Sequence, residues 1–163
     1  MDGAGRYGGA PQCSAATLKG RYQRLCEAII RQHCDSCAAR AACRVWEAVV
    51  QRRLQWAIWC ECATCGPTEE FGWDETPPES RQALLDQCGV FRLRVSPGTQ
   101  FSRVRLMKEL RAMGVSMAEV SAAMDDLLSA GVTGTEVEMQ LLAMKLQGSG
   151  VETAIAKVSS GSE

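Results

Sequence analysis

The chain has 163 residues, of which 46% are hydrophobic and 23% are charged, and its formal net charge is -1. This composition is typical of a globular protein with one sizeable domain or two small ones. The small net charge excludes a global attraction to nucleic acid or anionic membranes, and no apolar run reaches the roughly 18–20 residues of a membrane-spanning helix.

Residues 1–16 are rich in Gly and lack the apolar core of a signal peptide, so we expect a flexible arm on an intracellular protein, cytoplasmic or nuclear. Thiols are normally reduced there, and clustered cysteines then indicate metal binding more than disulfides. The total of nine cysteines is odd, which also fits poorly with a fully paired disulfide framework.

Two helices are expected in the first half of the chain. In residues 17–33 apolar side chains recur at helical spacing, and basic residues take most positions between them. Residues 38–59 contain neither Gly nor Pro and carry a broad apolar stripe, which predicts a second helix. Because the connection is short, we expect an antiparallel, cysteine-rich helical hairpin over 17–65.

The segment 66–76 combines Gly, Pro and acidic residues, which predicts an acidic linker or loop and a domain boundary. Thr76 and Glu79 match a capping box, so a helix should begin at 77 and end near Cys88. Residues 90–96 alternate with period two and predict a strand. A further helix is expected over 101–113.

An internal repeat then recurs with an offset of 17 residues, and in each copy a helix-ending Gly precedes a capping box. We therefore expect a helical domain over 77–158 and a tail over 159–163. The predicted fold class is mainly α, with a helical hairpin, a bundle of short helices, and at most one short strand or hairpin near 90–96. The two predicted capping boxes are Ser116/Glu119 and Thr133/Glu136.

Seven cysteines lie between Cys26 and Cys65, and their spacing indicates metal ligation. Two Cys-x-x-Cys pairs within this stretch suit tetrahedral zinc by residue type. A helix over 38–59 would however rise roughly 33 Å, at about 1.5 Å per residue, and would hold the two pairs apart. The helical hairpin predicts two separate sites instead, Cys26, Cys34, Cys37 and Cys43 at one end and Cys60, Cys62, Cys65 and Cys13 at the other.

Zinc is the metal we expect, in a closed structural site. His33 and Cys88 are spare ligands, although a packed, hydrogen-bonded side chain is the stronger interpretation of His33. Two alternatives need no metal: the cysteines can be buried as small hydrophobic residues, or they can form disulfides.

The run from Cys34 to Cys43 reads Cys-Asp-Ser-Cys-Ala-Ala-Arg-Ala-Ala-Cys, and it resembles the three-cysteine motif of WhiB-like iron–sulfur regulators. The resemblance covers ten residues, and Arg44-Val45-Trp46-Glu47 stands in place of the family's Gly-Val-Trp-Gly-Gly turn. It implies an iron–sulfur cluster as the alternative cofactor and a thiol redox or iron–sulfur sensor as an alternative function.

Basic residues concentrate in 19–53 and 92–111, and either stretch could contact nucleic acid. Solvated surface that complements the acidic stretches is the competing interpretation. A helix-turn-helix at 107–124 is disfavoured, because its second helix carries no Lys or Arg. The candidate nucleic-acid contacts are Arg21, Arg24, Arg31, Arg40, Arg44, Arg52, Arg53, Arg92, Arg94, Arg103 and Arg105.

The chain shows no phosphate-binding glycine loop, catalytic triad or zinc-hydrolase motif, so we expect no enzyme. The favoured function is a cysteine-rich adaptor or regulatory protein that contains structural metal and binds protein partners. The alternative is a nucleic-acid-binding regulator, whose binding would weaken steeply with salt. The alternating charge blocks are compatible with a homo-oligomer, and no membrane partner is expected.

Overall fold

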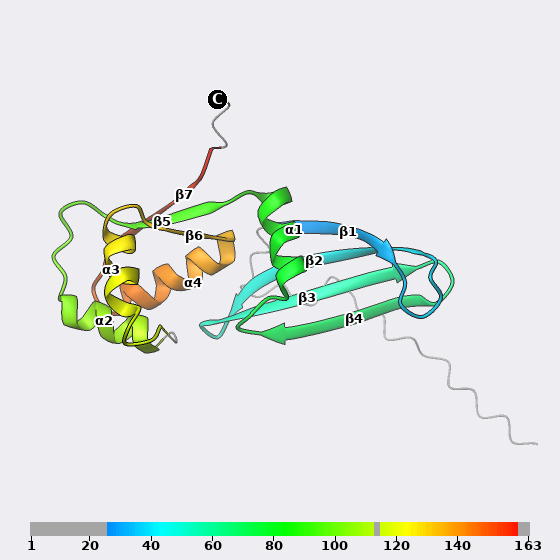
Figure 1. The fold of residues 1–163 in the computed structure, drawn as a ribbon, viewed down its shortest axis with the longest axis horizontal. Coiled ribbons are helices and arrows are strands. Elements are labelled where there is room, and N and C mark those ends of the chain that lie inside the picture. The colour runs from blue at the N-terminus through cyan, green and yellow to red at the C-terminus, as the bar shows by residue number, and fades with distance from the viewer. Residues whose placement is uncertain (1–25, 113–114, 160–163) are drawn as a thin grey trace, which may run out of the picture.

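The structure is a computed structural model that describes residues 26–112 and 115–159. Within them lie two antiparallel sheets, one with the strand order β1-β2-β3-β4 and one with the order β6-β5-β7 (Figure 1). The elements in chain order are β1 (Glu27–His33), β2 (Arg40–Val50), β3 (Arg53–Cys62), β4 (Gly66–Trp73), α1 (Pro78–Cys88), β5 (Phe91–Val95), α2 (Arg103–Ala112), α3 (Val120–Leu128), β6 (Val132–Gly134), α4 (Glu136–Gln147) and β7 (Thr153–Lys157).

The prediction of a mainly α fold is wrong, since 31% of the residues that the structure describes are helical and 37% lie in strands. The predicted helix over 38–59 is instead the β2–β3 hairpin, whose two-residue turn holds Gln51 at φ 50° and Arg52 at φ 62°. Positive φ at both central residues suits the twist of a tight hairpin. The valines and tryptophans of this segment favour the pleated surface of a sheet over a helix.

Two further predictions in the same half are corrected. The part of the predicted helix 17–33 that the structure describes forms β1. The predicted acidic linker or loop over 66–76 is mostly β4, which pairs with β3 from Gly66 to Trp73. A single four-stranded meander therefore replaces the helical hairpin and its linker.

Capping residues and hydrophobic periodicity predicted the elements after residue 76 more accurately. The helix expected from 77 is α1, the strand expected near 90–96 is β5, and the helix expected over 101–113 corresponds to α2. The predicted capping pairs had different outcomes. Before α3, the hydroxyl of Ser116 accepts from the N–H of Glu119 at 3.3 Å and donates to its carboxylate at 2.6 Å, so this pair interacts as predicted. Thr76 makes no cap to α1, and the box that begins α4 joins Thr135 to Glu138, two residues after the predicted pair.

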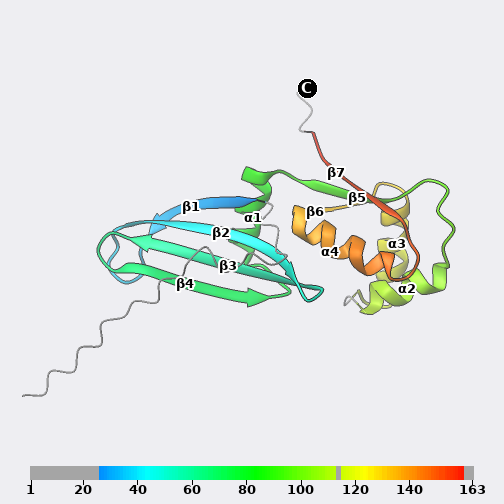
Figure 2. The ribbon, with the colours of Figure 1, turned by 180° about the vertical axis from the view of Figure 1, so that it is seen from behind.

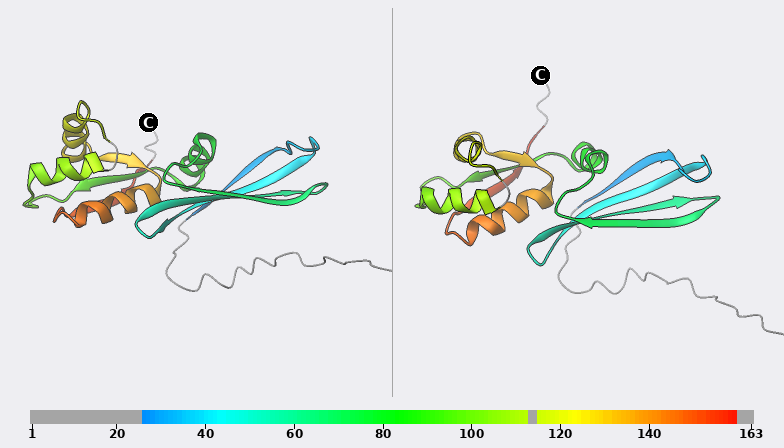
Figure 3. Two further views of the ribbon diagram at one scale, coloured as in Figure 1. Left: turned by 90° about the horizontal axis from the view of Figure 1, so that it is seen from below. Right: turned by 60° about the horizontal axis from the view of Figure 1, so that its bottom comes forward.

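Each sheet has its own core. Leu93 of β5, Leu106 of α2, Leu127 of α3 and Leu146 of α4 are fully buried in the core beneath the three-stranded sheet. The four-stranded sheet packs one face, here called the inner face, against α1 and α4. Figure 3 shows α1 over this sheet, and Figure 2 shows α4 next to the end of the β2–β3 hairpin. The residues buried there include Ala28, Val45, Leu84, Leu54, Trp56 and Val137.

A buried polar cluster joins the two halves. The carboxylate of Glu47 in β2 is 2% exposed and accepts hydrogen bonds of 2.5 Å from the hydroxyls of Thr76 and Thr135. Arg81 of α1 forms a two-bond ion pair with Glu138 of α4 beside it, at 2.6 and 2.9 Å. Burial raises the pKa of the Glu47 carboxyl. These contacts fix the position of α4 and α1 on the inner face.

Candidate metal centre

Two turns at one end of the four-stranded sheet carry the two Cys-x-x-Cys pairs. Cys34 and Cys37 lie in the turn between β1 and β2, and Cys62 and Cys65 lie where β3 turns into β4. Strands β2 and β3 run antiparallel with Ala41 opposite Cys62, so both turns reach the same end of the sheet (Figure 1). The chain doubles back once between the pairs, which is what brings them together.

The four sulfurs lie close enough together to surround one metal ion. The Sγ atoms of Cys34 and Cys65 are 3.8 Å apart, and those of Cys37 and Cys62 are 3.5 Å apart. All four lie within 4.8 Å of one another. Four thiolates at a zinc–sulfur distance of about 2.3 Å would be separated from each other by about 3.8 Å. These four cysteines can therefore hold one metal ion.

Backbone geometry shapes both turns around the sulfurs. In the first turn the carbonyl of Cys34 accepts from the N–H of Ala38 at 2.8 Å, and Ala38 adopts a left-handed φ of 56°. In the second turn the N–H of Cys65 donates to the sulfur of Cys62 at 3.5 Å, and Gly66 follows at φ 86°. A residue with a Cβ would be strained at this angle, so Gly66 suits the exit from the turn.

The thiols have different proton affinities in this arrangement. Hydrogen bonds from the backbone N–H groups of Cys65 and Thr64 lower the pKa of Cys62 to about 6. Hydrogen bonds with Cys37 and Cys34 raise the pKa of Cys65 to about 12. Four thiolates at this distance repel one another, so a bound cation is needed to hold all four deprotonated, and metal binding releases protons.

The predicted metal ligands fall into one four-cysteine cluster and two disulfides, where the sequence predicted two metal sites. The argument that the two Cys-x-x-Cys pairs cannot share an ion is wrong, because 38–59 is a hairpin and not a helix. Cys43 and Cys60 face each other across β2 and β3 and form a disulfide, and Cys26 forms a second disulfide with Cys88. Cys13 lies outside the described residues. His33 is not part of the sulfur cluster.

A sequence signal for this site was present. Two Cys-x-x-Cys pairs separated by an intervening stretch are a known zinc pattern, and their spacing does not depend on the structure of that stretch. The sequence offered no comparable signal for the two disulfides. Their cysteines are brought together by strand register and by the packing of α1 against β1.

The candidate nucleic-acid contacts that the structure describes are distributed over both sheets and α2. Arg31, Arg40 and His33 line an open hollow of about 670 Å³ next to the metal end of the sheet. Most other candidates have partners: Arg44 pairs with Glu61, Arg53 with Asp74 and Arg103 with Asp125, while Arg52 and Arg94 donate to backbone carbonyls. Arg105 is exposed on α2, the Nε atom of Arg92 is buried, and Arg21 and Arg24 lie outside the described residues.

Comparison of the chain with protein-family models, curated proteins and solved structures gives no match. Among the described residues, no helix is long and apolar enough to cross a membrane.

Proposed function

We propose that the protein is a non-enzymatic binding module in which one zinc ion, held by Cys34, Cys37, Cys62 and Cys65, fixes the end of the four-stranded sheet. The observation that carries the proposal is the convergence of four sulfurs from two separate turns to within 4.8 Å of one another. A site with four thiolate ligands leaves no open coordination position for substrate, which favours a structural role.

The close spacing of the sulfurs also favours a single ion over a cluster. An iron–sulfur cluster contains several iron atoms, which would hold its cysteine ligands further apart than one tetrahedral ion does. The intracellular location stays a prediction, and the two disulfides weigh against it, because cytosolic thiols are kept reduced.

The outer face of the four-stranded sheet, opposite α1 and α4, supports a role in protein binding. Ile29 is 43% exposed, Phe71 is 63% exposed and Trp73 is 38% exposed, and all three belong to this face by strand register. Exposed aromatic and aliphatic side chains gathered on one surface commonly mark an interaction site. A sheet whose end is fixed by a metal ion would hold these three side chains in a rigid arrangement.

The test is a metal-removal experiment on the full chain, followed by amide-resolved NMR. Chelation should collapse the dispersed signals of residues 26–73, one equivalent of zinc should restore them, and Cys37→Ser should prevent the restoration. Ser36→Ala, in the same turn, is the matched control and should behave as the wild type. Unchanged spectra after complete metal removal would contradict a structural metal.

Nucleic-acid binding is the second candidate function, and the hollow lined by Arg31, Arg40 and His33 favours it. No ion pair involving either arginine is found within the described part of the chain. Retention of a single-stranded oligonucleotide should then fall steeply with salt and be lost in Arg31→Ala/Arg40→Ala. Salt-independent or absent retention would leave protein binding as the better proposal.

A further inference from the structure

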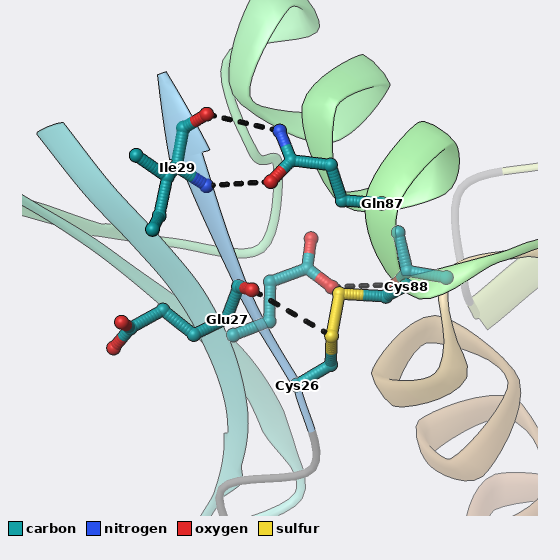
Figure 4. The surroundings of a disulfide bond; sticks show 7 residues. Cys26, Glu27, Ile29, Gln87 and Cys88 are labelled. Atoms are coloured by element: carbon teal, nitrogen blue, oxygen red, sulfur yellow. Dashed lines mark hydrogen bonds between the residues drawn. A yellow bond between two sulfur atoms is a disulfide. The ribbon is translucent and has the colours of Figure 1, made fainter. Parts of the chain in front are cut away.

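The two edges of the four-stranded sheet differ in whether they can accept another strand. At the β1 edge, the side-chain amide of Gln87 accepts from the N–H of Ile29 at 2.9 Å and donates to its carbonyl at 3.0 Å (Figure 4). This amide imitates the peptide group of a neighbouring strand. The disulfide between Cys26 and Cys88 ties α1 to the same edge. The β1 edge is therefore occupied at its centre.

Within the part of the chain that the structure describes, the β4 edge has no neighbouring strand, and residues 67–71 are all exposed. The N–H of Asp74 donates to the carbonyl of Leu54. Along an antiparallel strand, residues that are hydrogen-bonded to the neighbouring strand alternate with residues that are not. Because Asp74 is hydrogen-bonded to β3, residues 69, 71 and 73 are not, and their N–H groups point away from β3. The carbonyls of Glu69 and Phe71 face the same way. These groups form a short unpaired ladder.

The side chains along this edge indicate the kind of strand it would accept. Glu69 and Glu70 are exposed, and neither has an ion pair within the described ranges. Phe71 is the most exposed aromatic residue of the sheet, and the guanidinium of Arg53 lies 5.0 Å from the ring of Trp73. The edge thus combines unpaired backbone groups, two carboxylates and an apolar position.

We propose that the β4 edge binds an extended, basic segment of a partner protein as a fifth strand of the sheet. The bound segment would carry basic residues opposite Glu69 and Glu70 and an apolar residue opposite Phe71. This names the partner class for the proposed binding function and rests on that function. A second copy of the chain is a poorer occupant, because it would bring four carboxylates together along one seam.

Acidic residues and Pro67 on an edge strand have a simpler explanation, which is protection against uncontrolled pairing. The two explanations differ in one respect. A protected edge resists every incoming strand, whereas a recognition edge accepts one with complementary charge and free backbone N–H groups. A peptide designed to match the edge separates them.

The probe is acetyl-Val-Thr-Val-Lys-Lys-Thr-amide, titrated into the zinc-loaded full chain and followed by calorimetry and by amide NMR. In antiparallel register its two lysines lie opposite Glu70 and Glu69, and its second valine lies opposite Phe71. Binding should shift the amide signals of residues 69, 71 and 73 most. N-methylation of the third and fifth peptide residues should weaken binding at least 10-fold, and replacing both lysines by glutamate should do the same.

Two protein variants complete the test. Phe71→Pro removes an outward N–H from the edge and should weaken binding at least 10-fold, whereas Phe71→Leu retains that N–H and should bind within about 3-fold of the wild type. No peptide binding at millimolar concentration, or equal binding of the N-methylated peptide, would overturn the proposal. A dimer of the free chain in sedimentation that Phe71→Pro disrupts would also overturn it, in favour of self-pairing. Zinc content measured on each sample shows separately whether the metal-stabilised module is intact.

Discussion

Glu47 has a buried carboxyl group, and its burial favours the protonated form over the charged form. Burial raises its pKa above the ordinary value of 4.5, although hydrogen bonds from Thr135 and Thr76 oppose that shift. The protonated folded form is therefore most favourable at low pH, and this contribution to stability is lost as pH rises through the folded-state pKa. Glutamine has nearly the same shape and keeps hydrogen-bonding capacity toward both hydroxyls.

The first prediction concerns this loss of stability with rising pH, which a glutamine at position 47 would not show. Urea unfolding of the wild type, compared with Glu47→Gln at each pH from 4.5 upward, should show a stability difference that moves in favour of the glutamine variant as pH rises. Glu47→Ala should cost about 2–4 kcal/mol, because it leaves the buried hydroxyls of Thr76 and Thr135 without the carboxylate to which they donate. A difference between wild type and Glu47→Gln that is constant with pH would show that the carboxyl does not titrate differently in the folded state.

The second residue-scale prediction concerns the division of the cysteines. Because Cys43 and Cys60 are bonded to each other, replacing both by serine should leave the zinc content of the chain unchanged. Stability should fall by about 2–4 kcal/mol with the loss of the cross-link. Elemental analysis and thermal unfolding of the double variant measure the two effects. Loss of zinc would mean that one of these sulfurs is a ligand.

At the scale of the elements, β4 depends on a close approach to β3. A Cβ at Gly72 would lie 2.4 Å from the ring of Trp56, which is closer than carbon atoms can pack. Glycine at this position leaves room for the Trp56 indole to pack against the strand on the inner face. The ring is itself 9% exposed and contributes to the contact with Val137 of α4.

The third prediction is that Gly72→Ala destabilises the chain by about 1–3 kcal/mol through displacement of the Trp56 ring. Thr68→Ala, on the same strand but exposed, should cost less than about 1 kcal/mol. Urea unfolding followed by tryptophan fluorescence measures both. Equal effects for the two substitutions would show that the strand adjusts around the added methyl group without strain.

The elements also show which parts of the fold the sequence could predict. Helix α1 was predictable because Pro77 and Pro78 mark its start and Gly89 its end, and these signals act locally. The β2–β3 hairpin was not, because Gln51-Arg52 is not a usual turn sequence and no Gly or Pro interrupts the segment. Buried Glu47 also breaks the alternation of apolar and polar residues that would have indicated a strand.

The wrong helix prediction for residues 38–59 also caused the errors in the predicted metal sites. Both Cys-x-x-Cys pairs were recognised as candidate metal ligands, and the structure brings these four cysteines close enough together to hold an ion. Their separation into two sites followed only from the supposed rigid helix between them. Cys43 and Cys60 appeared to be ligands for the same reason, since cross-strand partners cannot be identified when the strands are taken for a helix.

At the scale of the whole molecule, two cores meet through a small number of contacts. The three-stranded sheet with α2, α3 and α4 encloses its own leucines, and the four-stranded sheet buries only a thin inner face. A sheet with one thinly covered face gains little from burial, so a metal ion at its end and a disulfide between its two central strands, β2 and β3, would supply needed stability. The contacts of α4 with both sheets and the pair Arg81–Glu138 keep the halves together.

The central claim is that one zinc ion joins the two turns through four sulfurs. The most direct measurement is zinc X-ray absorption on the full chain purified without added metal, together with the zinc content of the same sample. We expect one zinc per chain with four sulfurs at about 2.3 Å, and loss of zinc or of one sulfur in Cys65→Ser. Nitrogen or oxygen ligands in the wild type, or a chain that binds no zinc, would contradict the claim.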